Sequence, residues 1–337
     1  QMKKHLKLMT ILLVFLPIAC GLGTLLIGRY GISTADTLSV LLSLVTGNES
    51  GVDGKAALII TEIRLPRALI GAFVGAALAV SGAAFQSLFC NPLVNSGILG
   101  VSSGAGFGAA LSIILIGQGN ATFIFAFAFG CLAVGMSYLI GRAYGEASTI
   151  MLVLGGTVVS SIFGALLSFL KYIADPYNQL PAITFWLMGS LASVNRQGLI
   201  AAIIPMAIGI IGIVILRWRL NVLSMGDKEA QALGTNVTLV KGAVVVSATL
   251  ATAGAVCISG IVGWIGLIIP HMARMLLGSD NRLIVPASIS LGASFMIIVD
   301  TFSRSLTGSE IPLGIITALL GGPFFIYLLK KTKGGGW

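Results

Sequence analysis

Long apolar stretches separated by short polar segments dominate the sequence. From Ala68 to Gly141 the chain contains no Asp, Glu, Lys or Arg. A hydrocarbon core about 30 Å thick needs roughly 20 apolar residues for each helical crossing, so this stretch alone is long enough for three crossings. The same pattern predicts ten spans in the whole chain, at about 8–28, 68–88, 97–117, 121–140, 150–170, 198–216, 242–259, 260–278, 283–303 and 313–329.

The fold class follows from these spans. We predict an all-α, polytopic membrane protein with one transmembrane domain over residues 1–337. The boundary between the seventh and eighth spans is open, because residues 242–273 carry no charge. Composition agrees with the prediction: 9% of residues are charged, 56% are hydrophobic and the mean hydropathy is +1.02, which excludes an ordinary soluble domain.

The distribution of charge predicts the orientation. Cytoplasmic segments of membrane proteins carry an excess of Lys and Arg. With ten spans both termini lie on one side, and placing them in the cytoplasm puts 13 basic and 4 acidic residues inside, against 7 of each outside. The net charge of +9 then lies wholly on the cytoplasmic side. Topology therefore explains the basic character, and a nucleic acid partner is not needed.

Three arginines are predicted to lie outside, against this trend. Arg64 and Arg67 flank the start of the second span, where Pro66 suits a helix start, and Arg304 ends the ninth. One interpretation is that their side chains reach up to lipid headgroups. The other is docking of an extracellular partner, because guanidinium groups bind carboxylates bidentately. Asp300 is a candidate proton carrier, but Arg304 lies one helical turn away and favours an ion pair.

A short helix is predicted in the cytoplasmic segment between Arg217 and Lys241. Residues 226–234 combine an acidic first turn, good helix formers and a terminal glycine. This helix is too short to span a membrane, so it either structures the loop or contacts a soluble partner. The candidate contact residues are Gly226, Asp227, Glu229, Ala230, Gln231, Leu233 and Gly234.

Besides this cytoplasmic segment, a polar segment interrupts the apolar spans within the membrane region. Residues 91–106 are predicted to be too irregular for a plain helix, and such backbone must be buried in protein or line a water-filled cavity. Its candidate pathway residues are Asn91, Pro92, Ser102 and Ser103. The sequence has no G-x-x-x-x-G-K-[ST] nucleotide loop and no metal-ligand spacing or catalytic triad order, so we predict no catalytic residue, no metal site and no cofactor on this chain.

The motifs together resemble the FecCD family, the permeases of bacterial ABC importers for iron–siderophore, haem and cobalamin. The resemblance covers nearly the whole chain in order. Its motifs are Arg64–Gln86, Asn91-Pro-Leu, Gly100-Val-Ser-Ser-Gly104, Phe185-Trp-Leu-Met-Gly-Ser190, the 226–234 helix, Gly263-Trp-Ile-Gly-Leu-Ile-Ile-Pro-His271 and Glu310-Ile-Pro-Leu-Gly314.

This resemblance implies a fold like that of the cobalamin importer permease, in a bacterial inner membrane. It implies a homodimer with two cytoplasmic ATPases that hold ATP and Mg, and a periplasmic or extracellular substrate-binding protein. Arg64, Arg67 and Arg304 match the arginines that receive glutamates of the binding protein, and the 226–234 helix matches the coupling helix that contacts the ATPase. Ser148 and Thr149 align with polar residues at a cytoplasmic gate.

The functional hypothesis is the permease of an importer for a metal chelate, with alternating access at the homodimer interface. One alternative is the same machine carrying an oxyanion such as molybdate or tungstate. An ion-coupled secondary transporter and a membrane scaffold without transport activity are alternatives from other classes. The sequence does not identify the cargo.

Overall fold

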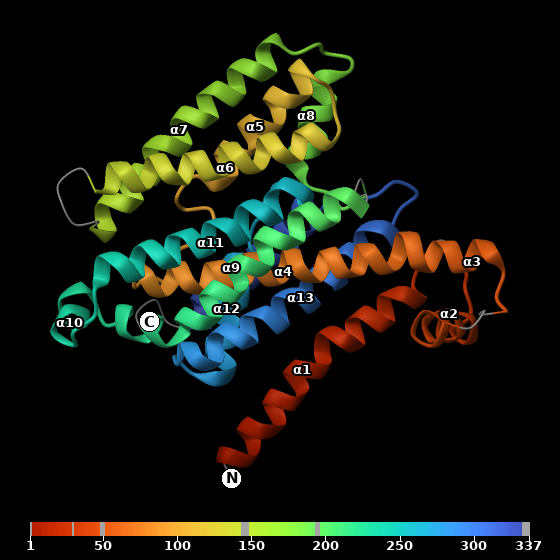
Figure 1. Ribbon diagram of the computed structural model, residues 1–337, viewed down its shortest axis with the longest axis horizontal. Helices are drawn as coiled ribbons and strands as arrows, with labels where there is room; N and C mark the ends of the chain where they lie inside the picture. The colour runs from red at the N-terminus through yellow and green to blue at the C-terminus, as the bar shows by residue number, and fades with distance from the viewer. Residues whose placement is uncertain (1, 29, 48–50, 143–147, 193–195, 332–337) are drawn as a thin grey trace.

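The fold is helical throughout the part of the chain that can be described. The computed structural model describes residues 2–28, 30–47, 51–142, 148–192 and 196–331, and all the regular elements in these ranges are helices (Figure 1). Each predicted span coincides with one of the longer helices: α1 (Met2–Leu26), α4 (Leu65–Leu88), α5 (Val101–Leu115), α6 (Asn120–Gly141), α7 (Thr149–Ile173), α9 (Arg196–Leu223), α11 (Val237–Ser259), α12 (Ile265–Leu277), α13 (Asn281–Ser305) and α14 (Leu313–Lys331).

Length and composition qualify six helical stretches in the described chain as membrane spans. They contain α4, α6, α7, α9, α11 and α13, while the apolar parts of α1, α5, α12 and α14 are shorter. The chain is therefore a multi-pass membrane protein, and the total of ten crossings stays a prediction. Shorter elements complete the fold: α2 (Thr34–Thr46), α3 (Gly54–Leu58), the π-helix η1 (Ile59–Arg64), α8 (Gln179–Met188) and α10 (Asp227–Ala232).

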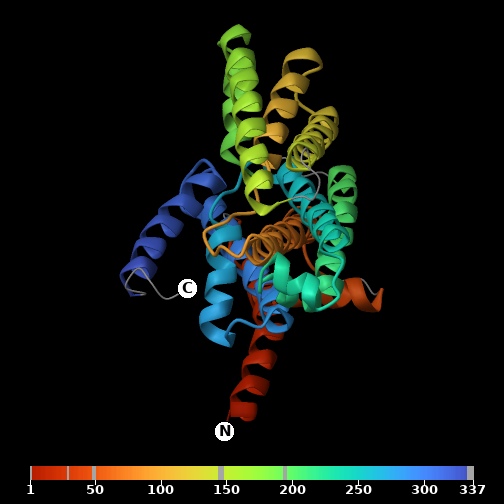
Figure 2. The same ribbon diagram turned by 90° about the vertical axis from the view of Figure 1, so that its left-hand side faces the viewer.

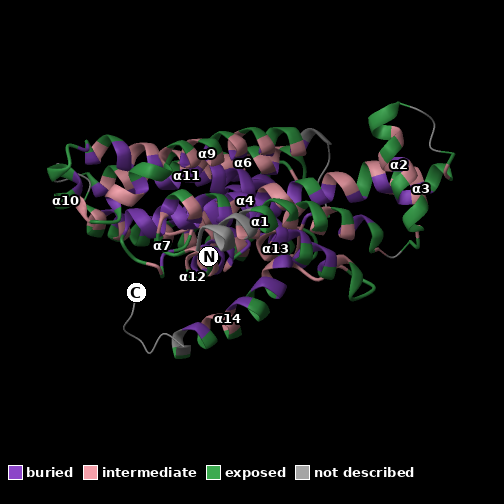
Figure 3. Ribbon diagram, turned by 90° about the horizontal axis from the view of Figure 1, so that it is seen from below, coloured by how far each residue is buried: buried purple, intermediate pink, exposed green. Residues whose placement is uncertain are grey.

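The centre of the bundle consists of α4, α11 and α13. In these helices 78, 72 and 67% of the most apolar window is buried, against 22–28% in α6, α7 and α9. Figure 3 shows buried residues concentrated in the middle of the bundle and exposed residues at its margins. The peripheral helices keep an apolar surface exposed, as a lipid environment allows.

Glycine permits the central helices to touch. Gly75 of α4 faces Gly292 of α13, and a Cβ on either residue would overlap the backbone carbonyl of the other. Gly82 of α4 has the same relation to the carbonyl of Gly266 in α12. Small residues let membrane helices approach closely in the absence of an aqueous hydrophobic drive. The abundance of glycine in the chain therefore serves packing at these contacts.

The other helices extend from this centre in different directions. α1 and the group α5–α8 lie on opposite sides of the central helices in both Figures 1 and 2, and α14 leaves the bundle on a third side (Figure 2). α2 and α3 lie at one end of the long axis and α10 at the other (Figure 1). We call the α2–α3 end the outer end and the α10 end the inner end, following the predicted orientation.

Two boundaries differ from the sequence predictions. The irregular backbone ends at Gly100, which caps α5 with φ +87°, so the expectation that the irregular segment continues to residue 106 is wrong. Ser102 and Ser103 instead lie in the first turn of α5. The seventh and eighth spans are separated by residues 260–264, where Gly260 and Trp264 have φ values of +68° and +69°. Both boundaries lie at residues with positive φ, and the distribution of charge in the sequence does not show where such residues occur.

Candidate functional site at the two ends of the bundle

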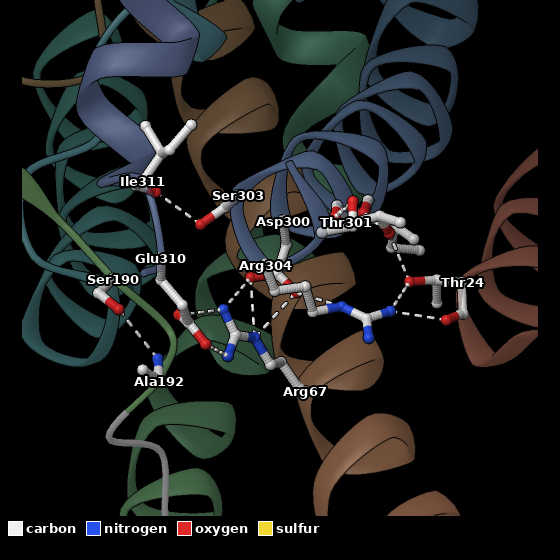
Figure 4. Close-up of polar contacts among 12 residues, drawn as sticks. Thr24, Arg67, Ser190, Ala192, Asp300, Thr301, Ser303, Arg304, Glu310 and Ile311 are labelled. Carbon is white, nitrogen blue, oxygen red and sulfur yellow. Dashed lines mark hydrogen bonds and ion pairs between the residues drawn. The ribbon is translucent and has the colours of Figure 1, made fainter. Parts of the chain in front are cut away.

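The outer end contains a buried arginine held by two carboxylates. Arg67, at the start of α4, donates from Nε to Asp300 Oδ1 and Oδ2 at 2.9 and 3.0 Å, and from Nη2 to Oδ1 at 2.8 Å. It also donates from Nη1 and Nη2 to the two oxygens of Glu310 at 2.7 and 2.8 Å (Figure 4). Asp300 comes from α13 and Glu310 from the segment before α14, so one guanidinium joins three parts of the fold.

Arg304 extends this cluster to the first helix. It lies one turn after Asp300 on α13, and its Nε is 3.8 Å from Asp300 Oδ2. Its Nη2 donates to the carbonyl oxygen and to the hydroxyl of Thr24 in α1, both at 2.6 Å (Figure 4). The predicted pairing of Asp300 with Arg304 is therefore present, but Arg67 makes the shorter contacts with that carboxylate.

Arg64 binds a different part of the outer end. It is the last residue of η1 and is buried, with Nη1 donating to the carbonyl of Leu25 and Nη2 to that of Tyr30, both at 2.6 Å. Pro66 follows at the start of α4, as the sequence predicted. All three arginines thus lie at the outer end and bind groups of their own chain, and their role in docking a binding protein stays a prediction.

A cavity of about 290 Å³ adjoins this cluster. Glu310 belongs both to the cavity wall and to the ion-pair cluster, and the Phe185–Ser190 motif supplies much of the remaining lining. The backbone around it is fixed across elements: Ser190 N donates to the Ser259 carbonyl at 2.9 Å, and Leu313 N to that of Gly189 at 2.9 Å. Sequence reasoning missed Glu310 as a partner of Arg67. The available signals were its position as the first residue of the Glu310–Gly314 motif and as an acidic residue just before an apolar span.

The inner end presents the predicted short helix. α10 covers Asp227–Ala232, between Gly226 and Gly234, whose φ values are +110° and +74°. Its neighbours in space are α9 and α11. Ala230 is fully buried, whereas Glu229, Gln231 and Leu233 are exposed, with Leu233 at 62%. The helix therefore anchors one side on the bundle and turns polar and apolar side chains outward.

The two predicted gate residues begin α7. The Ser148 hydroxyl accepts a hydrogen bond from Met151 N at 3.2 Å, which caps the helix. The Thr149 hydroxyl accepts one from Lys241 Nζ at 3.1 Å, and the same nitrogen donates to Asp227 Oδ2 at 2.6 Å. The structure thus links Thr149 of α7 to Asp227 of α10 through Lys241, a residue that the sequence analysis did not select, and the role of Ser148 and Thr149 as a gate stays a prediction. The sequence marked it only as the lysine immediately before the predicted span 242–259.

The irregular segment after α4 borders two cavities. Asn91 and Pro92 help to line one of about 610 Å³ at the inner end, together with Arg274 and His271. Residues of the same segment, including Asn95, line a second cavity of about 420 Å³. This cavity is also lined by three hydroxyl-bearing residues of α7, Thr157, Ser160 and Ser161. Asn91 and Pro92 thus border a cavity at the inner end, and their part in a transport pathway stays a prediction.

Comparisons with known proteins agree with this architecture. The profile of the FecCD transport family matches residues 12–331. The chain is 41% identical to the molybdate import system permease protein MolB of Haemophilus influenzae, over 92% of this chain and 91% of the relative. It is 38% identical to the cobalamin import system permease protein BtuC of Halobacterium salinarum, over 84% of this chain and 76% of the relative.

A solved structure supports the same fold. It is described as an inward-facing conformation of a metal-chelate type ABC transporter and is 38% identical to this chain. The match has a TM-score of 0.83 and covers 95% of this chain and 97% of the other.

Proposed function

This chain belongs to the FecCD transport family, and we propose that it is the membrane-spanning permease subunit of an ATP-driven importer in a bacterial inner membrane. Two copies would form the transport pathway at their interface, and two cytoplasmic ATPase subunits would bind ATP and Mg. A periplasmic or extracellular binding protein would deliver the cargo. The apolar helices and the family match over almost the whole chain support this proposal.

α10 is the observation that carries the coupling role. One side of this helix is fixed by the buried Ala230, and its exposed side combines charged, amide and aliphatic groups. A loop that only connected α9 and α11 would not require an apolar side chain such as Leu233 on its exposed side. Such a surface suits a cleft on a soluble ATPase, which would move α10 when it binds ATP.

We propose a metal chelate as the cargo. Several family relatives are permeases for iron chelates, hemin and cobalamin. The cavity beside α7 is lined by uncharged residues, which offer few specific contacts, so the binding protein would supply most of the selectivity. Similarity to a molybdate permease supports an oxyanion as the second candidate.

An ion-coupled carrier is the less favoured alternative. Such a carrier needs an ionisable group in the membrane that can gain and lose a proton during transport. Asp300 was the candidate, and its carboxylate lies between Arg67 and Arg304 in a buried cluster. Asp300 is paired with two guanidinium groups, an arrangement that suits a structural role better than a proton relay.

Transport by the reconstituted complex tests the proposal. The permease would be assembled with its ATPase and binding protein in proteoliposomes, and each candidate cargo would be offered to the binding protein first. We expect uptake of a bound cargo only with ATP, and none with an imposed proton gradient alone. Gradient-driven uptake by the permease without partners, abolished by Asp300→Asn, would contradict the importer assignment.

Cross-linking tests the role of α10 separately. Leu233→Cys should form a cross-link to the ATPase, since this side chain is exposed on the proposed contact surface. Cys90 must first be changed to Ser, because it is also exposed near the inner end. Free labelling of position 233 by a soluble reagent in the assembled complex would rule out contact there.

A further inference from the structure

A buried lysine joins three helices at the inner end. Lys241 lies in the second turn of α11, and its side chain is only 1% exposed. Its ammonium group is 2.6 Å from Asp227 Oδ2 at the start of α10 and 3.1 Å from the Thr149 hydroxyl at the start of α7. One nitrogen therefore contacts both the proposed coupling helix and the proposed gate.

Burial makes this contact sensitive to the position of α10. An ammonium group removed from water is costly unless a carboxylate and hydrogen-bond acceptors compensate it. The compensating Asp227 is itself 38% exposed and belongs to a helix of six residues. A displacement of α10 therefore either carries the Lys241 ammonium with it or leaves a buried charge without that partner.

The lysine also connects parts of the fold that otherwise pack separately. α7 packs mainly against α5 and α6, whereas α10 packs against α9 and α11. Figure 1 places the start of α7 and α10 at the same end of the bundle, on opposite sides of α11. The flexible four-carbon stem and three donors of lysine suit a link that must follow movement while keeping its partners.

We propose that Lys241 is a positioning residue that transmits displacement of α10 to the first turn of α7, and so couples the ATPase to the gate. This inference rests on the proposed importer function. Asp227 moves with α10, because it is the first residue of that helix. The Lys241 ammonium follows the Asp227 carboxylate, and the Thr149 hydroxyl moves with the ammonium. Ser148, which caps α7, would move with the same turn.

Substitutions of Thr149 test the link without removing a charge. Thr149→Val keeps the side-chain shape and removes the acceptor, whereas Thr149→Ser keeps the hydroxyl. In the complete complex in proteoliposomes, ATP hydrolysis and cargo uptake would be measured together. We expect Thr149→Val to raise the ATP hydrolysed per cargo about tenfold, as loss of a hydrogen bond to a charged group predicts, and Thr149→Ser to remain near the unmodified ratio.

Thr238→Val is the matched control, because this threonine lies one turn before Lys241 on α11 and is only partly buried. The control should leave the ratio unchanged. Lys241→Met should raise the ratio as Thr149→Val does. Equal ratios for Thr149→Val and Thr149→Ser would overturn the inference.

Hydrogen exchange gives a readout that a purely structural role would not change. Peptides from α10 and from the first turn of α7 would be followed with and without trapped nucleotide. In the unmodified complex both should respond; in Thr149→Val only α10 should. A normal α7 response in that variant would overturn the inference while leaving the importer proposal intact.

If Thr149→Val does not assemble, Thr149→Ala gives the same comparison. Absence of any nucleotide response in α10 of the unmodified complex would overturn the importer proposal and this inference with it.

Discussion

The outer and inner ends of the bundle use buried charge in contrasting ways. At the outer end Arg67 binds two carboxylates through both edges of its guanidinium, and Arg304 and Thr24 extend the cluster to α1. At the inner end the Lys241 ammonium forms an ion pair with Asp227, a partly exposed carboxylate on a short helix.

These contacts give the outer end a rigid connection between helices and the inner end a movable one. A planar guanidinium with two bidentate partners has little freedom, so α4, α13 and the segment before α14 are fixed together. A lysine stem can rotate while it keeps its partners. We interpret the outer cluster as a clamp and the inner contact as a flexible link.

Removing the outer arginine should have the largest effect. Arg67→Met leaves Asp300 and Glu310 without their shared partner, and breaking a buried ion pair from one side costs about 3–5 kcal/mol. We expect a strongly lowered melting temperature for the purified permease in nanodiscs, followed by tryptophan fluorescence. Lys55→Gln, which removes an exposed charge at the same end, serves as the control and should melt normally. An unchanged melting temperature for Arg67→Met would contradict the clamp.

The docking role of the outer arginines is the next test. Arg64→Gln combined with Arg304→Gln should weaken binding of the cognate binding protein by about 2–5 kcal/mol if these guanidinium groups receive its carboxylates. Surface plasmon resonance with the permease in nanodiscs measures this affinity. Lys55→Gln, an exposed lysine at the same end, is the matched control. If affinity is unchanged while the melting temperature falls, the two arginines only attach α1 to the bundle.

A double-mutant cycle at the inner end should show a smaller effect. Asp227→Asn leaves the Lys241 ammonium buried with weakened compensation, and we expect a loss of about 1–3 kcal/mol, reduced because the carboxylate is partly exposed. The double variant Asp227→Asn with Lys241→Met should recover part of this loss, because no buried charge remains. Melting temperatures of the three variants measure the coupling. Strictly additive losses would show that the two groups do not interact.

The smallest expected effect concerns pH. Hydrogen bonds from Arg282, and then from Asn221, hold the pKa of Asp280 below its usual range. A carboxyl whose pKa is lower in the folded state stabilises the fold above its unfolded pKa of about 3.9, and this contribution is lost as the pH falls through the folded value. The melting temperature should therefore fall slightly below pH 4. Asp280→Asn should show a weaker pH dependence in that range, and an identical pH profile would contradict the assignment.

The sequence alone determined the secondary structure that depends on local composition. Each predicted span coincides with a helix because a residue needs only its own apolar neighbours to favour a span. Gly226 and Gly234 delimited α10 because only glycine takes their left-handed backbone without strain. The irregular segment was predicted to continue to residue 106, beyond the start of α5 at Val101, because polar Ser102 and Ser103 resemble loop residues, although they fit a helical first turn.

Apart from the pair of Asp300 with Arg304, one helical turn apart, only the tertiary structure shows which charges meet. Arg67 lies 233 residues from Asp300 and 243 from Glu310, and Lys241 lies 92 residues from Thr149. A buried charge requires a partner, but the sequence offered several carboxylates and hydroxyl groups to each of these residues. Helix packing determines the partners. The close approach of α4 to α13 at Gly75 and Gly292 places Arg67 beside Asp300. The position of α11 between α7 and α10 places Lys241 between the ends of these two helices.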